Sequence, residues 1–102
     1  MLITWDESKR RTNLKKHGWD FSLVQEVLDG ITYMEEDRRY NYPERRYWTF
    51  GLSGGHVVLI VHTETQGRFH VISFRKADRQ ESRRFWDRVG KPDRLGQGGR
   101  DG

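Results

Sequence analysis

The residues best suited to chemistry lie where the last predicted strand ends and a predicted helix begins. Between Arg75 and Arg88 the chain carries six basic and three acidic residues. Arginine can hold two oxygens of one phosphate, and the free amides of a helix N-terminus favour an anion. We therefore expect phosphate contacts from Arg75, Lys76, Arg79 and Arg83. The alternative is a solvated charged face, in which Glu81 pairs with Arg84.

A second candidate site precedes the strand predicted over residues 45–52. Glu44 could act as a general base there, and Arg46 could stabilise an anion. Four aromatic residues interleave with four arginines in this region: Tyr40, Tyr42, Tyr47 and Trp48 with Arg38, Arg39, Arg45 and Arg46. Rings beside cations suit stacking of unpaired bases and contacts to phosphates. The alternative is structural: charged residues at a strand edge that prevent aggregation, together with aromatic residues of the core, would give the same pattern.

Histidines form the third candidate set. His62 and His70 lie in predicted strands, and each could transfer a proton near neutral pH. A histidine in such a strand is more often a hydrogen-bonded residue of the core or the sheet. The four histidines are not at the short spacings typical of metal ligands, and the chain has no cysteine. We therefore expect no metal site and no cofactor.

The elements that must position these residues follow from hydrophobic spacing. A strand is predicted over residues 2–5, followed by a helix over 7–17 with Asp6 as its N-cap and Gly18 at its end. A helical stripe then recurs at Phe21, Val24, Val27 and Leu28. Later elements are a sheet segment at 31–34, a loop at 35–44, strands at 45–52, 56–63 and 68–74, and a helix from Ala77.

This order, β-α-α-β-β-β-β-α, predicts an α+β fold with an antiparallel sheet and helices on one face. In the strand at 45–52, alternation places Arg46, Trp48 and Phe50 on one face. The continuous apolar run at 56–63 predicts a central strand that is buried on both sides. We expect one domain over residues 1–89 and a flexible glycine-rich tail over 90–102.

Composition narrows the class of protein. The 102 residues carry a net charge of +4 with a pI of about 9.7, which favours a polyanionic partner. Aromatic residues make up 13% of the chain, too many for a disordered coil. The absence of cysteine excludes disulfides and thiol catalysis. There is no secretory signal and no apolar run of about 18 residues, so we expect a cytoplasmic protein without membrane contact.

Seven short blocks follow one another in register over about residues 2 to 86. They are Ile3–Lys9, Asn13–Gly18, Glu44 with Arg46, Gly51–Ser53, Val61–Glu64, Val71–Ala77, and Arg79 with Glu81. Together they resemble the BrnT family of ribonuclease toxins from type II toxin–antitoxin systems. The resemblance implies a RelE-like fold, a compact antiparallel sheet flanked by helices. It also implies metal-independent RNA cleavage that inhibits translation and arrests growth.

The resemblance further implies a partner, a BrnA-like antitoxin that neutralises the toxin. Two toxins and two antitoxins would form a heterotetramer, and operator DNA would be bound only through the antitoxin. Our mechanistic hypothesis places Arg75 and Arg46 on the scissile phosphate, with Glu44 or His62 as proton acceptor. Contacts to flanking RNA phosphates would come from Lys76, Arg79, Arg83 and Lys16.

Two other functions stay open from the sequence. One is a catalytically inactive RelE-like module that only docks with an antitoxin or with RNA. The other is a protein that binds duplex DNA directly, with the strong salt dependence of phosphate contacts. The chain lacks a helix-turn-helix pattern with a basic recognition helix, which makes direct DNA binding the weakest of the three.

Overall fold

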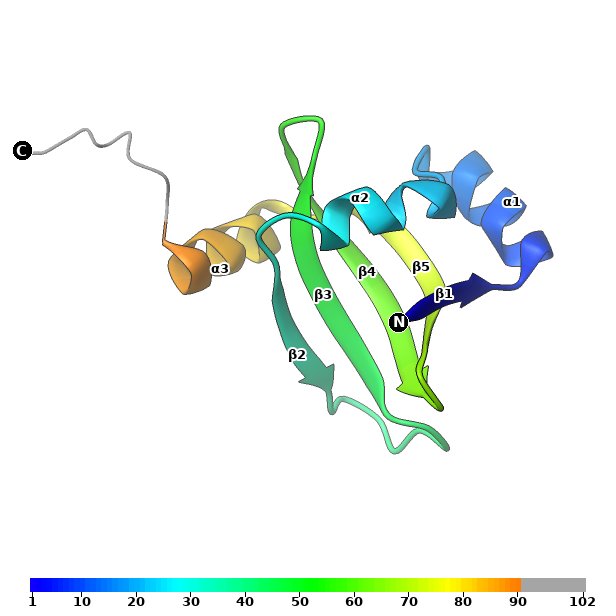
Figure 1. The fold of residues 1–102 in the computed structure, drawn as a ribbon. Coiled ribbons are helices and arrows are strands. Elements are labelled where there is room, and N and C mark those ends of the chain that lie inside the picture. Colours follow the sequence, from blue (N-terminus) through cyan, green and yellow to red (C-terminus); the bar gives the residue numbers. More distant parts are fainter. Residues whose placement is uncertain (91–102) are drawn as a thin grey trace, which may run out of the picture.

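The computed structural model describes residues 1–90 of the chain, so the predicted tail lies almost wholly outside the described part. Its centre is a five-stranded sheet with the order β1-β5-β4-β3-β2 (Figure 1). The strands are β1 (Leu2–Trp5), β2 (Tyr33–Asp37), β3 (Arg46–Ser53), β4 (His56–Thr65) and β5 (Arg68–Lys76). The helices are α1 (Glu7–His17), α2 (Val24–Leu28), which follows a 3₁₀ turn at Phe21–Leu23, and α3 (Arg79–Val89). The predicted order of elements is confirmed.

Local signals set the ends of the first helices. The Asp6 side chain accepts a hydrogen bond of 2.9 Å from the backbone N–H of Ser8 and so caps α1. Gly18 ends the helix with a φ of +77°, a left-handed conformation that glycine adopts without strain. Asp20 caps the 3₁₀ turn through the N–H of Ser22. The predicted bounds of the first helix are confirmed.

Two features of the sheet differ from the prediction. β1 pairs with β5 in parallel, so the sheet is mixed rather than wholly antiparallel. Residues 35–37, predicted as loop, belong to β2 and pair with β3. Arginines neutralise the carboxylates of this strand: Arg84 lies 2.6 Å from Glu35, and Arg39 lies 2.9 Å from Asp37. Residues 35–37 are acidic, a composition that predicts a loop. The partner of Glu35 comes from α3, far along the chain, so the sequence does not show that this charge is neutralised.

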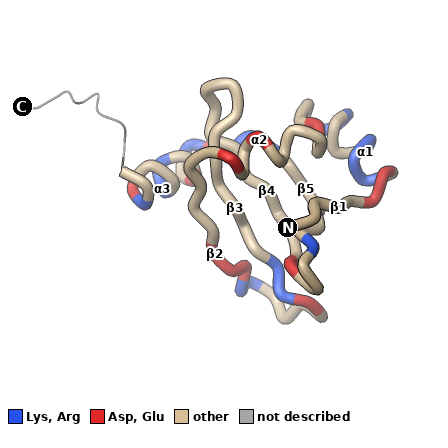
Figure 2. Tube along the Cα trace, in the orientation of Figure 1, with Lys and Arg blue, Asp and Glu red and all other residues tan. Residues whose placement is uncertain are grey.

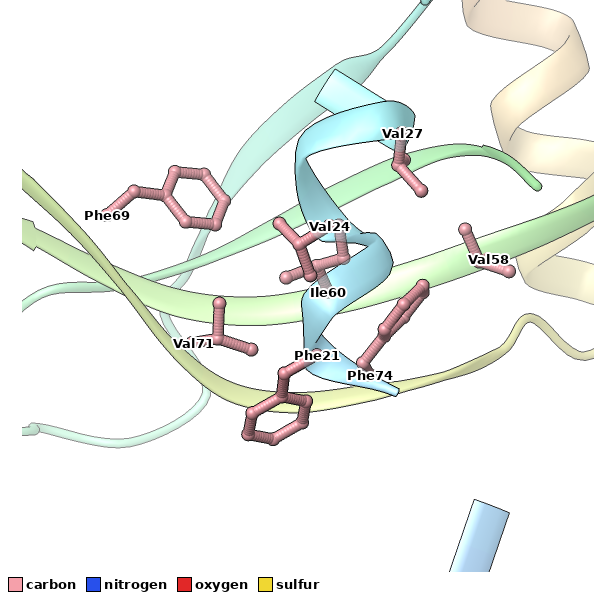
Figure 3. Close-up of a cluster of buried hydrophobic side chains, with 8 residues drawn as sticks. All are labelled: Phe21, Val24, Val27, Val58, Ile60, Phe69, Val71 and Phe74. Atoms are coloured by element: carbon pink, nitrogen blue, oxygen red, sulfur yellow. The ribbon is translucent and has the colours of Figure 1, made fainter. Parts of the chain in front are cut away.

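Hydrophobic clusters cover both faces of the sheet, which corrects the expectation that helices cover one. On the α2 face the cluster is Phe21, Val24, Val27, Val58, Ile60, Phe69, Val71 and Phe74 (Figure 3). On the α3 face it is Phe50, Val57, Leu59, Ala77 and Phe85. β4 contributes alternate residues to both clusters, so its prediction as a doubly buried central strand is confirmed.

Asn13 attaches α1 to the sheet where β1 has ended. Its side-chain amide accepts from the N–H of Phe74 at 3.1 Å and donates to the carbonyl of Phe74 at 2.7 Å. It also donates to the carbonyl of Trp19 at 3.0 Å. One side chain thus makes the two bonds that a neighbouring strand would make, and it satisfies a buried stretch of sheet edge.

Gly51 allows α2 to lie close against β3. A Cβ atom at this position would collide with Cγ1 of Val27, which is buried in the α2 cluster. The side-chain-free position therefore sets the distance between helix and sheet.

α3 covers only part of its face. Phe85 packs with Phe50 and Leu59 near the end of the sheet where β5 leads into the helix. Toward the opposite end the strands extend past the helices (Figure 1). This uncovered end of the α3 face holds the polar residues described next.

Candidate active site

A row of polar residues crosses all five strands at the uncovered end of the α3 face. The Cα partners from β2 to β1 are Asp37, Arg46, Thr63, His70 and Thr4. Directly opposed residues share a face of a sheet, with Cα atoms about 5 Å apart. We call these five residues the polar row. It brings a guanidinium and an imidazole to the same side of the sheet, with one threonine hydroxyl between them.

Arg46 supplies a positive charge that is held by an aromatic ring. Its guanidinium lies 4.4 Å from the centre of the Tyr42 ring, and this cation–π contact positions the charge without neutralising it. Arg46 forms no ion pair within residues 1–90. The contrast is with three other arginines on this side of the sheet, each paired with a carboxylate: Arg39, Arg75 and Arg84.

Asp37, the neighbour of Arg46 in the row, is committed to other partners. Arg39 donates two hydrogen bonds to its carboxylate and lowers the pKa of Asp37 to about 2. The Tyr42 hydroxyl donates to the same carboxylate at 3.1 Å. Tyr42 is therefore fixed at both ends: its hydroxyl by Asp37, its ring by Arg46.

His70 is oriented from β1. Its Nδ1 lies 2.8 Å from Oγ1 of Thr4, in a hydrogen bond between residues 66 positions apart in sequence. Within the described residues its Nε2 makes no hydrogen bond. An imidazole held through one nitrogen and open at the other is the arrangement of a proton-transfer group.

The middle of the polar row forms the floor of a cleft of about 220 Å³. The cleft is lined by Tyr42, Pro43, Glu44, Arg46, Thr63, His70 and Ile72. Glu44 comes from the loop between β2 and β3, where charged residues gather at the lower end of the sheet (Figure 2). The structure therefore brings together two of the predicted catalytic residues, Glu44 and Arg46.

The structure does not bring Arg75 to Arg46. Their partners on β4 are Leu59 and Thr63, four residues or about 13 Å apart along the strand, and β3 and β5 are about 10 Å apart. The Cα atoms are thus about 16 Å apart, so the two guanidinium groups would meet only on fully extended side chains directed toward each other. Arg75 instead donates to both oxygens of Glu81, at 2.8 and 2.9 Å.

Glu81 explains why Arg75 is held. Its carboxylate also accepts from the N–H of Asp78, while the Asp78 side chain accepts from the N–H of Glu81, which forms a capping box at the start of α3. Hydrogen bonds from Arg75 lower the pKa of Glu81 despite its burial. In this geometry Arg75 fastens α3 to β5.

His62 lies on the other face of the sheet. Its side chain is fully buried, its ring stacks on Phe69 at 3.7 Å, and its Nε2 lies 2.6 Å from Oγ1 of Thr49. Burial lowers the pKa of His62 to about 4, which keeps the ring neutral at pH 7. The sheet lies between the side chains of His62 and Arg46, so the predicted pairing of these residues on one substrate is not supported.

The predicted RNA-binding residues are dispersed. Lys76 pairs with Val58 and so belongs to the α2 face. Arg79 and Arg83 are exposed along α3. Lys16 lines a separate cleft beside α1.

Comparison with known families decides the identity. The family described as the ribonuclease toxin BrnT of type II toxin–antitoxin systems matches residues 5–81. The chain belongs to the BrnT family. A search of the curated proteins gave no match. The resemblance inferred from the short sequence blocks is thereby confirmed.

BrnT membership establishes the biochemical class. The family is a ribonuclease toxin, and a type II system implies an antitoxin partner. Within residues 1–90, no three histidine or acidic side chains converge as metal ligands. In the same range, none of the helices has the length and apolarity to cross a bilayer.

The polar row as a unit leaves no pattern in the sequence. Thr4 and Thr63 carry no signal, because threonine is common in strands. His70 is distinguished only as one of two histidines in predicted strands. The strand register would have revealed the row, but the parallel pairing of β1 could not be derived from local patterns.

Proposed function

We propose that the polar row is the ribonuclease active site of this BrnT toxin. Arg46 binds the scissile phosphate, Glu44 on the cleft wall accepts a proton from the RNA, and His70 is the second proton-transfer group. Thr4 positions His70 through the hydrogen bond to Nδ1.

The proposed reaction uses the 2′-hydroxyl of the RNA as nucleophile and needs no metal ion. The 2′ oxygen bonds to phosphorus while its proton passes to the carboxylate of Glu44. The bond from phosphorus to the 5′ oxygen breaks, and that oxygen takes a proton from the protonated imidazole of His70. The products are a 2′,3′-cyclic phosphate and a 5′-hydroxyl. Negative charge grows on the phosphoryl oxygens in the transition state, where a fixed guanidinium stabilises it most.

One observation carries this proposal: the register that aligns Arg46, Thr63 and His70 across three adjacent strands. Two strand spacings separate the outer Cα atoms by about 10 Å. The phosphate and the ribose of one nucleotide would lie over Thr63, between the two functional groups.

Cleavage of a labelled RNA by Arg46→Ala and Arg45→Ala proteins tests the proposal. Arg45 is the matched control, because it is the adjacent residue and its side chain is 77% exposed. We expect Arg46→Ala to cleave at least about 100-fold more slowly, as for loss of a preorganised charge contact, and Arg45→Ala to keep wild-type activity. Wild-type cleavage should survive EDTA.

Two results would count against the polar row. Full cleavage by folded Arg46→Ala protein would remove Arg46 from the mechanism. Growth arrest by wild-type protein without any RNA cleavage would favour the inactive binding module instead.

We also propose the finer assembly that the family resemblance implies. Two toxins and two antitoxins form the complex, and operator DNA is bound through the antitoxin. Light scattering on the co-purified complex should give the mass of a heterotetramer. The toxin alone should fail to shift an operator duplex that the complex shifts.

A further inference from the structure

We propose that the cleft between α1 and β5 is a second phosphate-binding site, which holds the RNA backbone beside the polar row. The cleft has a volume of about 340 Å³. It is lined mainly by residues of α1: Ser8, Lys9, Thr12, Lys16 and His17, with Ser73 from β5. The choice of RNA as ligand rests on the proposed function of the polar row.

One face of α1 forms one wall of this cleft. Lys9, Thr12 and Lys16 are three and four residues apart, so they lie on one face of the helix. Asn13, which also lines the cleft, ties that face to the backbone of Phe74. The lysines are therefore held against the edge of the sheet.

A bulge in β5 builds the other wall. The pairing with β4 runs from His62–Val71 to Val61–Ser73, so Ile72 is the extra residue. Ile72 lines both this cleft and the cleft of the polar row. It forms the ridge between the two.

The charged side chains that line the cleft, Lys9 and Lys16, are both positive. None of its lining residues is acidic, and within residues 1–90 neither Lys9 nor Lys16 forms an ion pair. Burial, followed by the nearby cations Lys16 and Arg75, lowers the pKa of His17. Such surroundings favour an anion, and lysine ammonium groups are point-charge ligands for phosphate.

The position of the cleft favours a continuous RNA strand over a separate ligand. Ser73 pairs with Val61, which lies on the same face as Thr63 of the polar row. His70 and Ser73 are three residues apart on β5, or about 10 Å. RNA that leaves the polar row across Ile72 would place its next phosphates between Lys9 and Lys16.

Binding of a fluorescent 2′-O-methyl RNA oligonucleotide tests this inference. The probe lacks the nucleophilic hydroxyl, so binding is measured without the proposed cleavage. The variant is Lys9→Gln/Lys16→Gln, and the matched control is Lys15→Gln, an exposed lysine of α1 outside the cleft. Loss of two phosphate contacts should flatten the slope of log K against log salt by about 1.4. We expect affinity to fall at least tenfold at low salt, with no change for Lys15→Gln.

The outcomes separate this inference from the proposed function. Affinity and salt slope equal to those of Lys15→Gln would overturn the second site. Weaker binding of the antitoxin with unchanged RNA affinity would assign the cleft to the antitoxin and also overturn it. If the double variant loses RNA affinity while Arg46→Ala still cleaves RNA, the second site stands and the polar-row mechanism fails.

Discussion

Replacement of Asn13 by alanine would remove the contact that joins α1 to the sheet. Three hydrogen bonds to the backbone disappear, and the N–H and carbonyl of Phe74 and the carbonyl of Trp19 lose their partner. A fourth bond, from the Ser73 hydroxyl, is 3.5 Å long and adds little. At about 1 kcal/mol for each bond, the loss is about 3 kcal/mol. The higher helix propensity of alanine offsets about 0.6 kcal/mol of this loss. The expected net destabilisation is therefore about 2 to 3 kcal/mol, a large part of the roughly 5 to 15 kcal/mol of a small domain.

Urea denaturation measures this effect. With an m-value of about 2 kcal/mol per molar, the midpoint should fall by about 1 to 1.5 M. Gln25→Ala is the control, because Gln25 is a helical amide that makes one exposed hydrogen bond, to Asp29. Its free energy of unfolding should change by less than about 0.5 kcal/mol.

Asn13→Asp sharpens the test. The carboxylate keeps an acceptor for the N–H of Phe74, but it faces two carbonyl oxygens that the amide had served as donor. At neutral pH we expect a loss at least as large as for Asn13→Ala. A midpoint for either variant that matches Gln25→Ala would refute the view that Asn13 replaces a strand at this edge.

Three further predictions follow from packing and charge. Gly51→Ala should destabilise the protein by about 1 to 3 kcal/mol because its Cβ presses into α2, whereas Gly30→Ala, with no close neighbour, should be near neutral in the same denaturation assay. Burial lowers the pKa of His62 from 6.5 to about 4, so the unfolded chain binds this proton first as pH falls. Up to about 3 kcal/mol of stability should be lost between pH 6.5 and 4, and His62→Gln should show a flatter pH profile of unfolding. Arg75→Ala should lower the free energy of unfolding by about 1 to 3 kcal/mol, since the carboxylate of Glu81 loses its partner. RNA cleavage by this variant should persist at a temperature at which it stays folded. Loss of cleavage in folded protein would return Arg75 to the active site.

The fold was predictable wherever local chemistry decides it. Capping by Asp6 and the stop at Gly18 gave the bounds of α1, and the apolar run at 56–63 gave a doubly buried strand. The parallel pairing of β1 with β5 was not predictable, because the sequence of a four-residue strand does not indicate which edge of a sheet it pairs with. The second half of β2, residues 35–37, was predicted as loop because one of the arginines that neutralise its carboxylates, Arg84, comes from α3.

The candidate site was predictable in residue type but not in arrangement. Arg46 and Glu44 stood out by charge beside aromatic residues, and the structure places both at one cleft. Arg75 stood out by its place between a strand and a helix, but its partner Glu81, in the first turn of α3, could not be assigned to it from the sequence. Alternation along β4 puts His62 on the same face as Val58 and Ile60, yet only the pairing of β3 with β4 shows that Arg46 belongs to the other face.

The origin of the polar row in all five strands bears on when this toxin can become active. Thr4 and His70 meet only after the first strand has joined the fifth, across 66 residues of chain. Pairings of such long range are slow steps of folding. A nascent chain with only its first four strands has neither His70 nor the strand that receives β1. The proposed active site therefore has no partial form, and RNA cleavage should begin only once the sheet is complete.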